Sequence, residues 1–323
     1  MRKIGIFLTC VLALAGCRHR TRFYTDVSGE PVAVVFDRFD RDIFTLDSSA
    51  LTAKYGAFVD LYLWQVMGLK SYSMVPFFLK DTSVQALDRD IEKVYPDLEA
   101  AERELTTAFQ YWRHYFPERA VPRLITHFSG YNQSLVAGDG VLSVSLDCYL
   151  GSDYAAYQGG VDGIYTYMLP YMTPRQLPQD VMLGFLMTEL PEPMPGSNLL
   201  EYMIYYGKLM YLLEVAFPER EPSELLSYTP EQYQWACRHE RQVWNYLAEQ
   251  NLLFASDRLT ISHFTQWAPF TTGLSQDSPG RMAWFTGLRI VESYMDNNRQ
   301  LGLPDLVSEQ DVQKILQMSG YRP

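Results

Sequence analysis

The sequence has little positive charge and no long hydrophobic run. Its 323 residues include 27 Lys and Arg against 38 Asp and Glu, a formal net charge of −11. Binding of nucleic acid depends on a basic surface, so this balance argues against nucleic acid as a partner. The apolar run near the N-terminus is shorter than the about 20 residues that a membrane-spanning helix needs. The composition therefore predicts a globular protein that neither binds nucleic acid nor spans a membrane.

Familiar catalytic motifs are also missing. No two histidines are four residues apart, so the HExxH zinc motif cannot occur, and His239 to Val243 (HERQV) is only a fragment of it. There is no G-x-S-x-G elbow, and Gly138-Asp139-Gly140 lacks the third glycine of a dinucleotide fingerprint. Asp37, Asp40 and Asp42 do not have EF-hand spacing. We therefore expect no metal and no cofactor, and assign no catalytic residue.

The N-terminus carries a lipoprotein signal. Two basic residues at positions 2 and 3 precede an apolar run over residues 4–14, which is typical of a secretory signal peptide. The run ends in Leu14-Ala15-Gly16-Cys17, which resembles the bacterial lipobox, whose cysteine receives diacylglycerol before cleavage. We expect removal of residues 1–16 and lipidation of Cys17, with an ordinary cleavage site as the alternative. Cleavage removes two basic residues and changes the formal charge to −13.

The residues after Cys17 predict where the protein is anchored. Position 18 is Arg rather than the Asp that resembles an inner-membrane retention signal, which favours the outer membrane. The stretch from Arg18 to Arg22 is basic and lacks the acidic cluster that resembles a surface-export signal, which favours a periplasmic-facing protein. Lipid supplies about 0.8 kcal/mol of membrane affinity for each buried CH₂. Residues 17–30 are thus expected to be the lipid anchor and a short tether.

Two cysteines remain in the mature chain, Cys148 and Cys237. An oxidising compartment allows a disulfide between them. Their surroundings differ, because Cys148 lies in a strand-like run and Cys237 in a helical one. We favour two buried free thiols over a bridge, since buried cysteine behaves as a small hydrophobic residue.

Apolar periodicity predicts the elements of a single α+β domain over residues 31–323, with no repeat and no linker. The first half should contain a strand at Val32–Phe36 and helices over 49–67 and 82–116. Short β-rich runs at 123–131 and 141–150 enclose an Asp139-Gly140 turn, which indicates a small antiparallel hairpin. The second half should be mainly helical, with helices over residues 179–190, 198–217, 229–250, 280–295 and 309–318.

The second β-rich run alternates in polarity. Leu142, Val144 and Leu146 fall on one face, which should pack against the core. Ser143, Ser145 and Asp147 fall on the other face, which we expect to be open to water.

The C-terminal half offers a candidate cleft. In the helix over 198–217, Gly207 permits close approach of another element and Lys208 lies beside it. Aromatic residues crowd this half, and they line either a cleft or, as is usual in a helical domain, the core. The residues that we assign to the candidate cleft are Tyr206, Lys208, Glu240, Trp244 and Arg289.

Several ordered segments closely resemble the gliding-motility lipoprotein GldB family of Bacteroidota. They run from about residue 30 to the C-terminus and include FDRFDRDIF (36–44), FSGYN and GVLSVSLDCYLG (128–151), LLEYMIYYGKLMYLLEVAFP (199–218), YTPEQYQWACRHERQVWNYL (228–247), APF (268–270), PGRMAWFTGLRIVESYM (279–295) and the final SGYRP. The resemblance implies a lipoprotein of the cell envelope linked to gliding, and it implies no catalytic activity.

The family in turn looks distantly similar to zincin-type peptidases. In those enzymes a strand and hairpin precede an HExxH helix, and a later helix with a Glu-Gly pair supplies the third zinc ligand. Here the helix over 179–190 has no histidine, and Tyr206-Gly207 stands where the Glu-Gly pair would be. The resemblance therefore implies a degenerate zincin scaffold without its metal.

These observations leave three hypotheses for function. The first is a non-catalytic lipoprotein that binds other envelope or motility proteins. The second is a divergent hydrolase that uses Glu189, Glu201 or Glu240. The third is a solute-binding lipoprotein, which only the aromatic content of the sequence supports.

Overall fold

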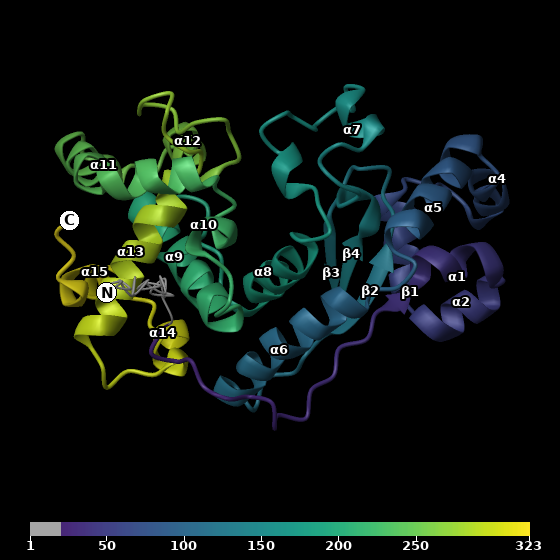
Figure 1. Ribbon diagram of the computed structural model, residues 1–323, viewed down its shortest axis with the longest axis horizontal. Coiled ribbons are helices and arrows are strands. Elements are labelled where there is room, and N and C mark those ends of the chain that lie inside the picture. Colours follow the sequence, from purple (N-terminus) through teal and green to yellow (C-terminus); the bar gives the residue numbers. More distant parts are fainter. Residues whose placement is uncertain (1–20) are drawn as a thin grey trace, which may run out of the picture.

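The computed structural model describes residues 21–323, so the predicted signal peptide and Cys17 lie outside the described residues. The molecule has a half that contains the sheet and a half made of helices. The two halves lie next to each other and are joined along one side (Figure 1). Their buried side chains form one continuous apolar cluster. Within residues 21–323, no helix is both long enough and apolar enough to cross a membrane. The predominantly helical α+β class is confirmed.

The sheet has four short strands in the order β1-β2-β4-β3. The strands are β1 (Asp37–Arg38), β2 (Arg123–His127), β3 (Leu135–Gly138) and β4 (Val141–Ser145). β2 pairs in parallel with both β1 and β4, and only β3 is antiparallel, to β4. The Asp139-Gly140 turn joins β3 to β4, so the expected antiparallel pairing of the two β-rich runs 123–131 and 141–150 is wrong. The sheet is mixed rather than antiparallel.

Both faces of β4 are covered. Ser143, Ser145 and Asp147 are fully buried, so the expectation of a wet face is wrong. Next to Ser143, His127 of β2 packs against the rings of Phe58 and Tyr62, which come from the helices before β2. The opposite face meets helix α8 (Leu177–Glu189), where Leu135 of β3 fills the space beside Gly184. The alternating polar residues of β4 therefore belong to an internal hydrogen-bond network and not to a face that is open to solvent.

The helices before β2 are shorter than the periodicity predicts. Their bounds are α1 (Phe39–Thr45), α2 (Ser48–Tyr55), α3 (Phe58–Asp60), a π-helix (Leu61–Val66), α4 (Val75–Leu79), α5 (Thr82–Val94) and α6 (Glu99–Tyr115). The expected helix 49–67 is broken at Gly56, which has a φ of 57°. The expected helix 82–116 is broken before Pro96, because a residue that precedes proline is disfavoured in the helical conformation.

The five helices expected after the sheet are confirmed, with ends shifted by one to three residues. The helices of this part are α7 (Ala155–Gln158), α8 (Leu177–Glu189), α9 (Leu199–Ala216), α10 (Pro222–Leu225), α11 (Pro230–Glu249), α12 (Arg258–Thr265), α13 (Met282–Asn297), α14 (Leu303–Ser308) and α15 (Val312–Ser319). The Asn198 and Thr229 side chains each complete a capping box, which fixes the starts of α9 and α11.

Helices α9 and α13 cross in direct backbone contact. A Cβ on Gly207 would overlap the backbone of Gly287, and a Cβ on Gly287 would overlap the carbonyl of Met203. Almost the whole of α9 is buried. The close approach that Gly207 predicts is therefore confirmed, and its partner is the glycine of α13.

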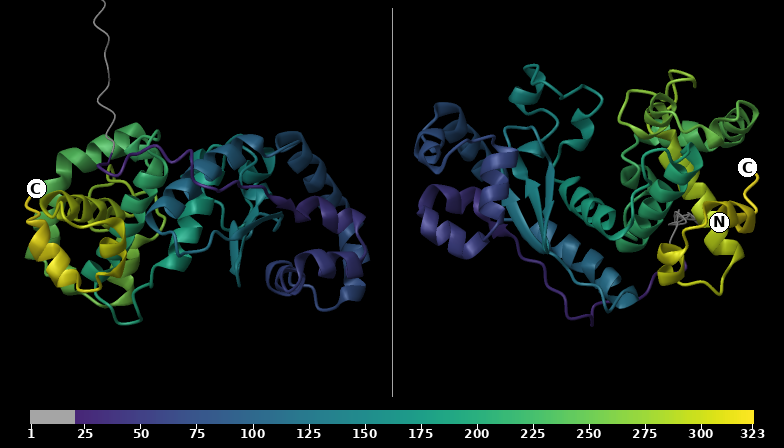
Figure 2. Two further views of the ribbon diagram at one scale, coloured as in Figure 1. Left: turned by 90° about the horizontal axis from the view of Figure 1, so that it is seen from below. Right: turned by 180° about the vertical axis from the view of Figure 1, so that it is seen from behind.

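Residues 21–36 form an extended segment that we call the strap. It runs from the helical half along the underside of α6 to β1 (Figures 1 and 2). The Val34 and Phe36 amides donate to Thr106 Oγ1 and Glu102 Oε1 of α6, each at 2.9 Å. The expected strand Val32–Phe36 is therefore wrong, because this extended chain pairs with helix side chains instead of a strand. The expected tether is docked on the domain from residue 21 onward.

Candidate functional site

A cavity of about 260 Å³ lies where the parallel strands β2 and β4 end. Ligand sites in sheets with parallel strands are favoured at this carboxyl edge. Its walls come from the loops after β2 and β4, the segment that follows α7, the first turn of α8 and Trp267, two residues beyond the end of α12. The lining includes Tyr131, Asn132, Ser134, Cys148, Tyr149, Asp162, Ile164, Met168, Tyr171, Asp180 and Trp267. We call this cavity the central cleft.

The loop after β2 is held by the buried carboxylate of Asp147. Its oxygens accept hydrogen bonds from the Ser129 amide at 3.1 Å, the Tyr131 amide at 2.7 Å and the Ser145 hydroxyl. These bonds stabilise consecutive left-handed residues, Gly130 and Tyr131, which turn the Tyr131 ring toward the cleft. Burial raises the pKa of Asp147, and its hydrogen bonds oppose that shift. This carboxylate shapes the wall of the cleft.

Asp180 is the acidic group that lines the cleft from α8. It is partly exposed and accepts hydrogen bonds from the Tyr149 hydroxyl at 2.9 Å and the Gln176 amide at 2.7 Å. Burial raises its pKa, and both hydrogen bonds counteract this effect. A half-buried carboxylate at the wall of a cavity can accept a ligand's donor or exchange a proton with it.

A buried arginine adjoins the central cleft. The Arg281 guanidinium lies between two indole rings, 3.7 Å from the centroid of Trp267 and 4.6 Å from that of Trp284. Its Nη2 donates to the carbonyl of Leu226 at 2.8 Å. Burial lowers the pKa of Arg281, and the charge of Asp180 opposes this. The guanidinium thus sets the position of Trp267, which forms part of the cleft wall.

The Tyr206 ring forms the far end of this aromatic stack. It lies parallel to the Trp284 ring with centroids 4.3 Å apart. Burial raises the pKa of Tyr206 to about 12. Tyr206 therefore packs at the end of the stack that lies away from the central cleft, and Trp267 packs at the end that lines it.

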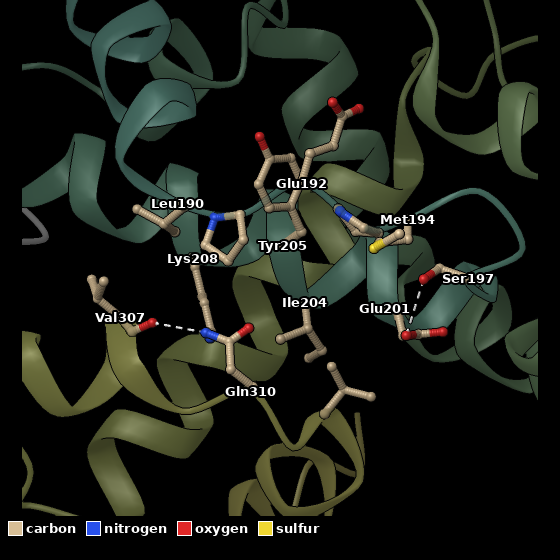
Figure 3. Close-up of a pocket in the computed structure, with 13 residues that line it drawn as sticks. Leu190, Glu192, Met194, Ser197, Glu201, Ile204, Tyr205, Lys208, Val307 and Gln310 are labelled. Carbon is tan, nitrogen blue, oxygen red and sulfur yellow. Dashed lines mark hydrogen bonds between the residues drawn. The ribbon is translucent and has the colours of Figure 1, made fainter.

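Lys208 lies in a separate pocket of about 240 Å³ (Figure 3). The pocket lies between α9, the loop before it and the chain that follows α14, and both Glu192 and Glu201 contribute to its lining. The Lys208 ammonium donates to the backbone carbonyl of Glu309, at the C-terminal end of α14. A cation there also interacts favourably with the helix dipole. Burial lowers the pKa of Lys208 to about 8.

Glu240 and Arg289 meet at a third place. Arg289 Nε donates to Glu240 Oε1 at 3.2 Å, and the Tyr321 hydroxyl donates to the same oxygen at 2.9 Å. Trp244 packs edge-on against the Tyr321 ring, with centroids 5.2 Å apart. Glu240, Arg289 and Tyr321 line a polar hollow of about 850 Å³ beside the C-terminal residues.

The five residues of the candidate cleft are thus distributed over three places. Glu240, Trp244 and Arg289 come together, whereas Tyr206 and Lys208 each lie elsewhere. The carboxylates named for a hydrolase are also apart from one another. Glu189 pairs with Arg119 at 3.0 Å, and Glu201 caps the start of α9.

The histidine and cysteine side chains that could take part in catalysis do not gather at the central cleft. His127 Nδ1 lies 2.6 Å from Ser143 Oγ, but both residues are fully buried in the sheet, and burial lowers the pKa of His127 to about 3. Cys148 and Cys237 are both free, as expected, although Cys237 is exposed rather than buried. In the part of the chain that the structure describes, no three His, Cys, Asp or Glu side chains gather as a metal site would require.

Reasoning from the sequence did not single out Asp180 or Arg281. A lone aspartate in the first turn of a helix is an ordinary helix-stabilising residue, so Asp180 carries no local signal. Arg281 lies within the segment PGRMAWF, whose Pro-Gly pair marks a turn. That turn leaves Arg281 in a left-handed conformation with a φ of 57°.

Fold and site together define a predominantly helical α+β protein with a ligand-sized cleft at the carboxyl edge of a mixed sheet. The chain belongs to the family described as gliding motility protein GldB, whose sequence model matches residues 20–323. The family resemblance drawn from the ordered segments is thereby confirmed, and it places the chain among envelope lipoproteins linked to gliding. Neither the curated proteins nor the solved structures contain a match. The zincin-like scaffold therefore stays a prediction.

Proposed function

We propose that this protein is a non-catalytic component of an outer-membrane-associated gliding machinery, anchored through lipid on Cys17 and facing the periplasm. Membership of the gliding-motility family supports the link to that machinery. The lipobox and the residues that follow it support the anchor and its location. The central cleft is the surface through which the protein binds another envelope protein.

The observation that carries this proposal is how the carboxylates at and behind the cleft wall are hydrogen-bonded. Asp147 is occupied by hydrogen bonds from the loop that it holds. Asp180 accepts from Tyr149 and Gln176 and still borders the cavity. The Cys148 thiol that lines the same cavity is buried, which raises its pKa and disfavours the reactive thiolate. This arrangement supports binding rather than bond cleavage.

The lining of the cleft favours a basic polypeptide segment as the occupant. Asp162 and Asp180 provide negative charge, while Tyr131, Tyr171 and Trp267 provide ring faces. A Lys or Arg side chain next to an apolar residue matches both features, because a cation binds carboxylates and aromatic faces.

Site-specific photocrosslinking in cells tests this function. A photoreactive side chain at Met168, in the cleft, is expected to capture a partner protein, and one at the exposed Gln317 of α15 serves as the matched control. The capture should be lost with Asp180→Asn or Trp267→Ala while protein abundance is unchanged, and spreading of the cells should decrease in parallel. Capture from position 168 that both variants leave intact would contradict the proposal.

The alternative of a divergent hydrolase is favoured by one observation, the raised pKa of Asp180 beside a cavity. Its test is metal analysis and a peptidase assay of protein purified from its native envelope. Stoichiometric zinc together with an activity that Asp180→Asn abolishes would establish the hydrolase. A thermal shift induced by envelope glycans would instead point to solute binding.

A further inference from the structure

The strap is fastened at its N-terminal end to the helical half of the molecule. Arg22 donates from Nη1 to the carbonyl of Arg299 at 2.6 Å and from Nη2 to the carbonyl of Leu301 at 2.5 Å. The Phe23 ring packs edge-on against Tyr115 of α6 and Tyr211 of α9. The connection between α13 and α14 is therefore the place where the docked chain begins.

The strap is also fastened along its length, so it cannot provide slack. The Tyr115 hydroxyl donates to the carbonyl of Phe23 at 2.6 Å, and the Tyr111 hydroxyl donates to the carbonyl of Thr25 at 2.8 Å. Farther along, the carboxylate of Glu30 lies 3.0 Å from His114 Nδ1. These contacts add to the amide bonds of Val34 and Phe36 with α6.

The docked strap leaves very little free chain before Cys17. Five Cα-to-Cα steps separate Cys17 from Arg22, and a fully extended chain covers at most about 3.6 Å in each step, or about 18 Å in total. A tether of this length keeps Arg22 close to a bilayer that holds lipid on Cys17. Arg18 and Arg20 belong to this stretch of sequence, and they add positive charge next to the anchor, which favours anionic lipid.

We propose that the strap orients the domain on the membrane, with the α13–α14 connection against the lipid surface and the central cleft on the side away from it. The segment around α7, which borders the cleft, lies on the other side of the molecule from α14 (Figure 1). This inference rests on the lipid anchor of the proposed function. It adds that the lipid surface has a defined docking face, centred on Arg22, Arg299 and Gln300.

Quenching by lipid-borne quenchers tests the orientation. The full-length acylated protein is reconstituted in phosphatidylethanolamine and phosphatidylglycerol vesicles, with Cys237→Ser to remove the exposed thiol. A fluorophore is attached to Gln300→Cys or, as the control, to Asp162→Cys at the cleft; both positions are exposed. Quenching at position 300 is expected to exceed that at position 162 by at least about twofold, because a short tether holds only one face near lipid.

Two variants separate orientation from anchoring. Insertion of about 20 Gly and Ser residues between Arg20 and Thr21 provides a flexible linker, and it should equalise quenching while the protein still floats with the vesicles. Arg22→Ala with Phe23→Ala removes only the first contacts of the strap, so it should reduce the difference in quenching without abolishing it. Equal quenching in the unmodified, vesicle-bound protein, or no effect of the insertion, would overturn the orientation. Failure of the unmodified protein to float would instead refute the anchor.

Discussion

The α9–α13 crossing and the contact between the strap and α6 both join distant parts of the chain, but they are built differently. At the crossing, two glycines bring helix backbones together without room for a methyl group. At the strap, side chains of α6 accept hydrogen bonds from an extended backbone. The first contact depends on shape and the second on donors and acceptors. They should therefore respond to different substitutions.

The largest effect is expected from Gly287→Ala. The new Cβ would overlap the carbonyl of Met203, so the two helices must separate, and we expect a loss of more than about 3 kcal/mol in the free energy of unfolding. Denaturant titration measures it. Gly29→Ala in the strap, where a Cβ meets no atom within 4 Å, is the control and should cost little. Equal losses in the two variants would mean that the crossing is not rigid.

A pH-dependent effect is expected from Glu214→Gln on α9. Glu214 is buried, and neither of its carboxyl oxygens has a hydrogen-bond partner among the described residues. Burial raises its pKa, with a further contribution from the charge of Glu292. A group with a raised folded-state pKa contributes stability below its unfolded pKa, and that stability is lost as the pH rises toward the folded pKa.

The Gln variant removes this dependence. It should match the unmodified protein near pH 4 and exceed its stability above that, by about 1.4 kcal/mol for each pH unit until the folded-state pKa is reached. Denaturant titrations from pH 4 to pH 8 measure the difference. The exposed Glu249→Gln is the control. A difference that stays constant with pH would show that Glu214 is not the responsible group.

The smallest effect is expected from Thr106→Ala. Loss of the hydroxyl that accepts the Val34 amide should cost about 1 kcal/mol, partly offset by the better helix propensity of alanine. Hydrogen exchange at Val34 should accelerate, while exchange in α13 stays slow. Thr107→Ala makes the same chemical change on the exposed side of α6. Faster exchange at Val34 in both variants would indicate that helix propensity, not the hydrogen bond, is responsible.

The helices with the strongest local signals could be predicted from the sequence. α9 and α11 begin at capping boxes and continue for many turns, so propensity, capping and burial agree. Strand pairing could not be predicted in the same way. The Asp139-Gly140 turn is a local feature, but the parallel pairing of β2 with β4 depends on the distant elements that cover the sheet.

The strap shows most clearly why the pairing partner of an extended segment cannot be predicted from its composition. Val32 to Phe36 has strand composition, but its hydrogen-bond acceptors are Glu102 and Thr106 on a helix. Glu240 and Arg289, both assigned to the candidate cleft, are hydrogen-bonded to each other. Asp180 and Arg281 are about a hundred residues apart in the chain, and only the fold brings them near enough for their charges to interact. Sequence patterns record local geometry, and long-range proximity is set by packing.

The partners of Arg22 also determine when the N-terminus can dock. The two carbonyls that accept its hydrogen bonds follow it by 277 and 279 residues. Contacts of such long sequence separation form slowly, because a large loop must close first. The strap cannot form all of its contacts until α13 and the residues after it are in place. Docking of Arg22 is therefore expected to be one of the last steps of folding, after the C-terminal helices have packed.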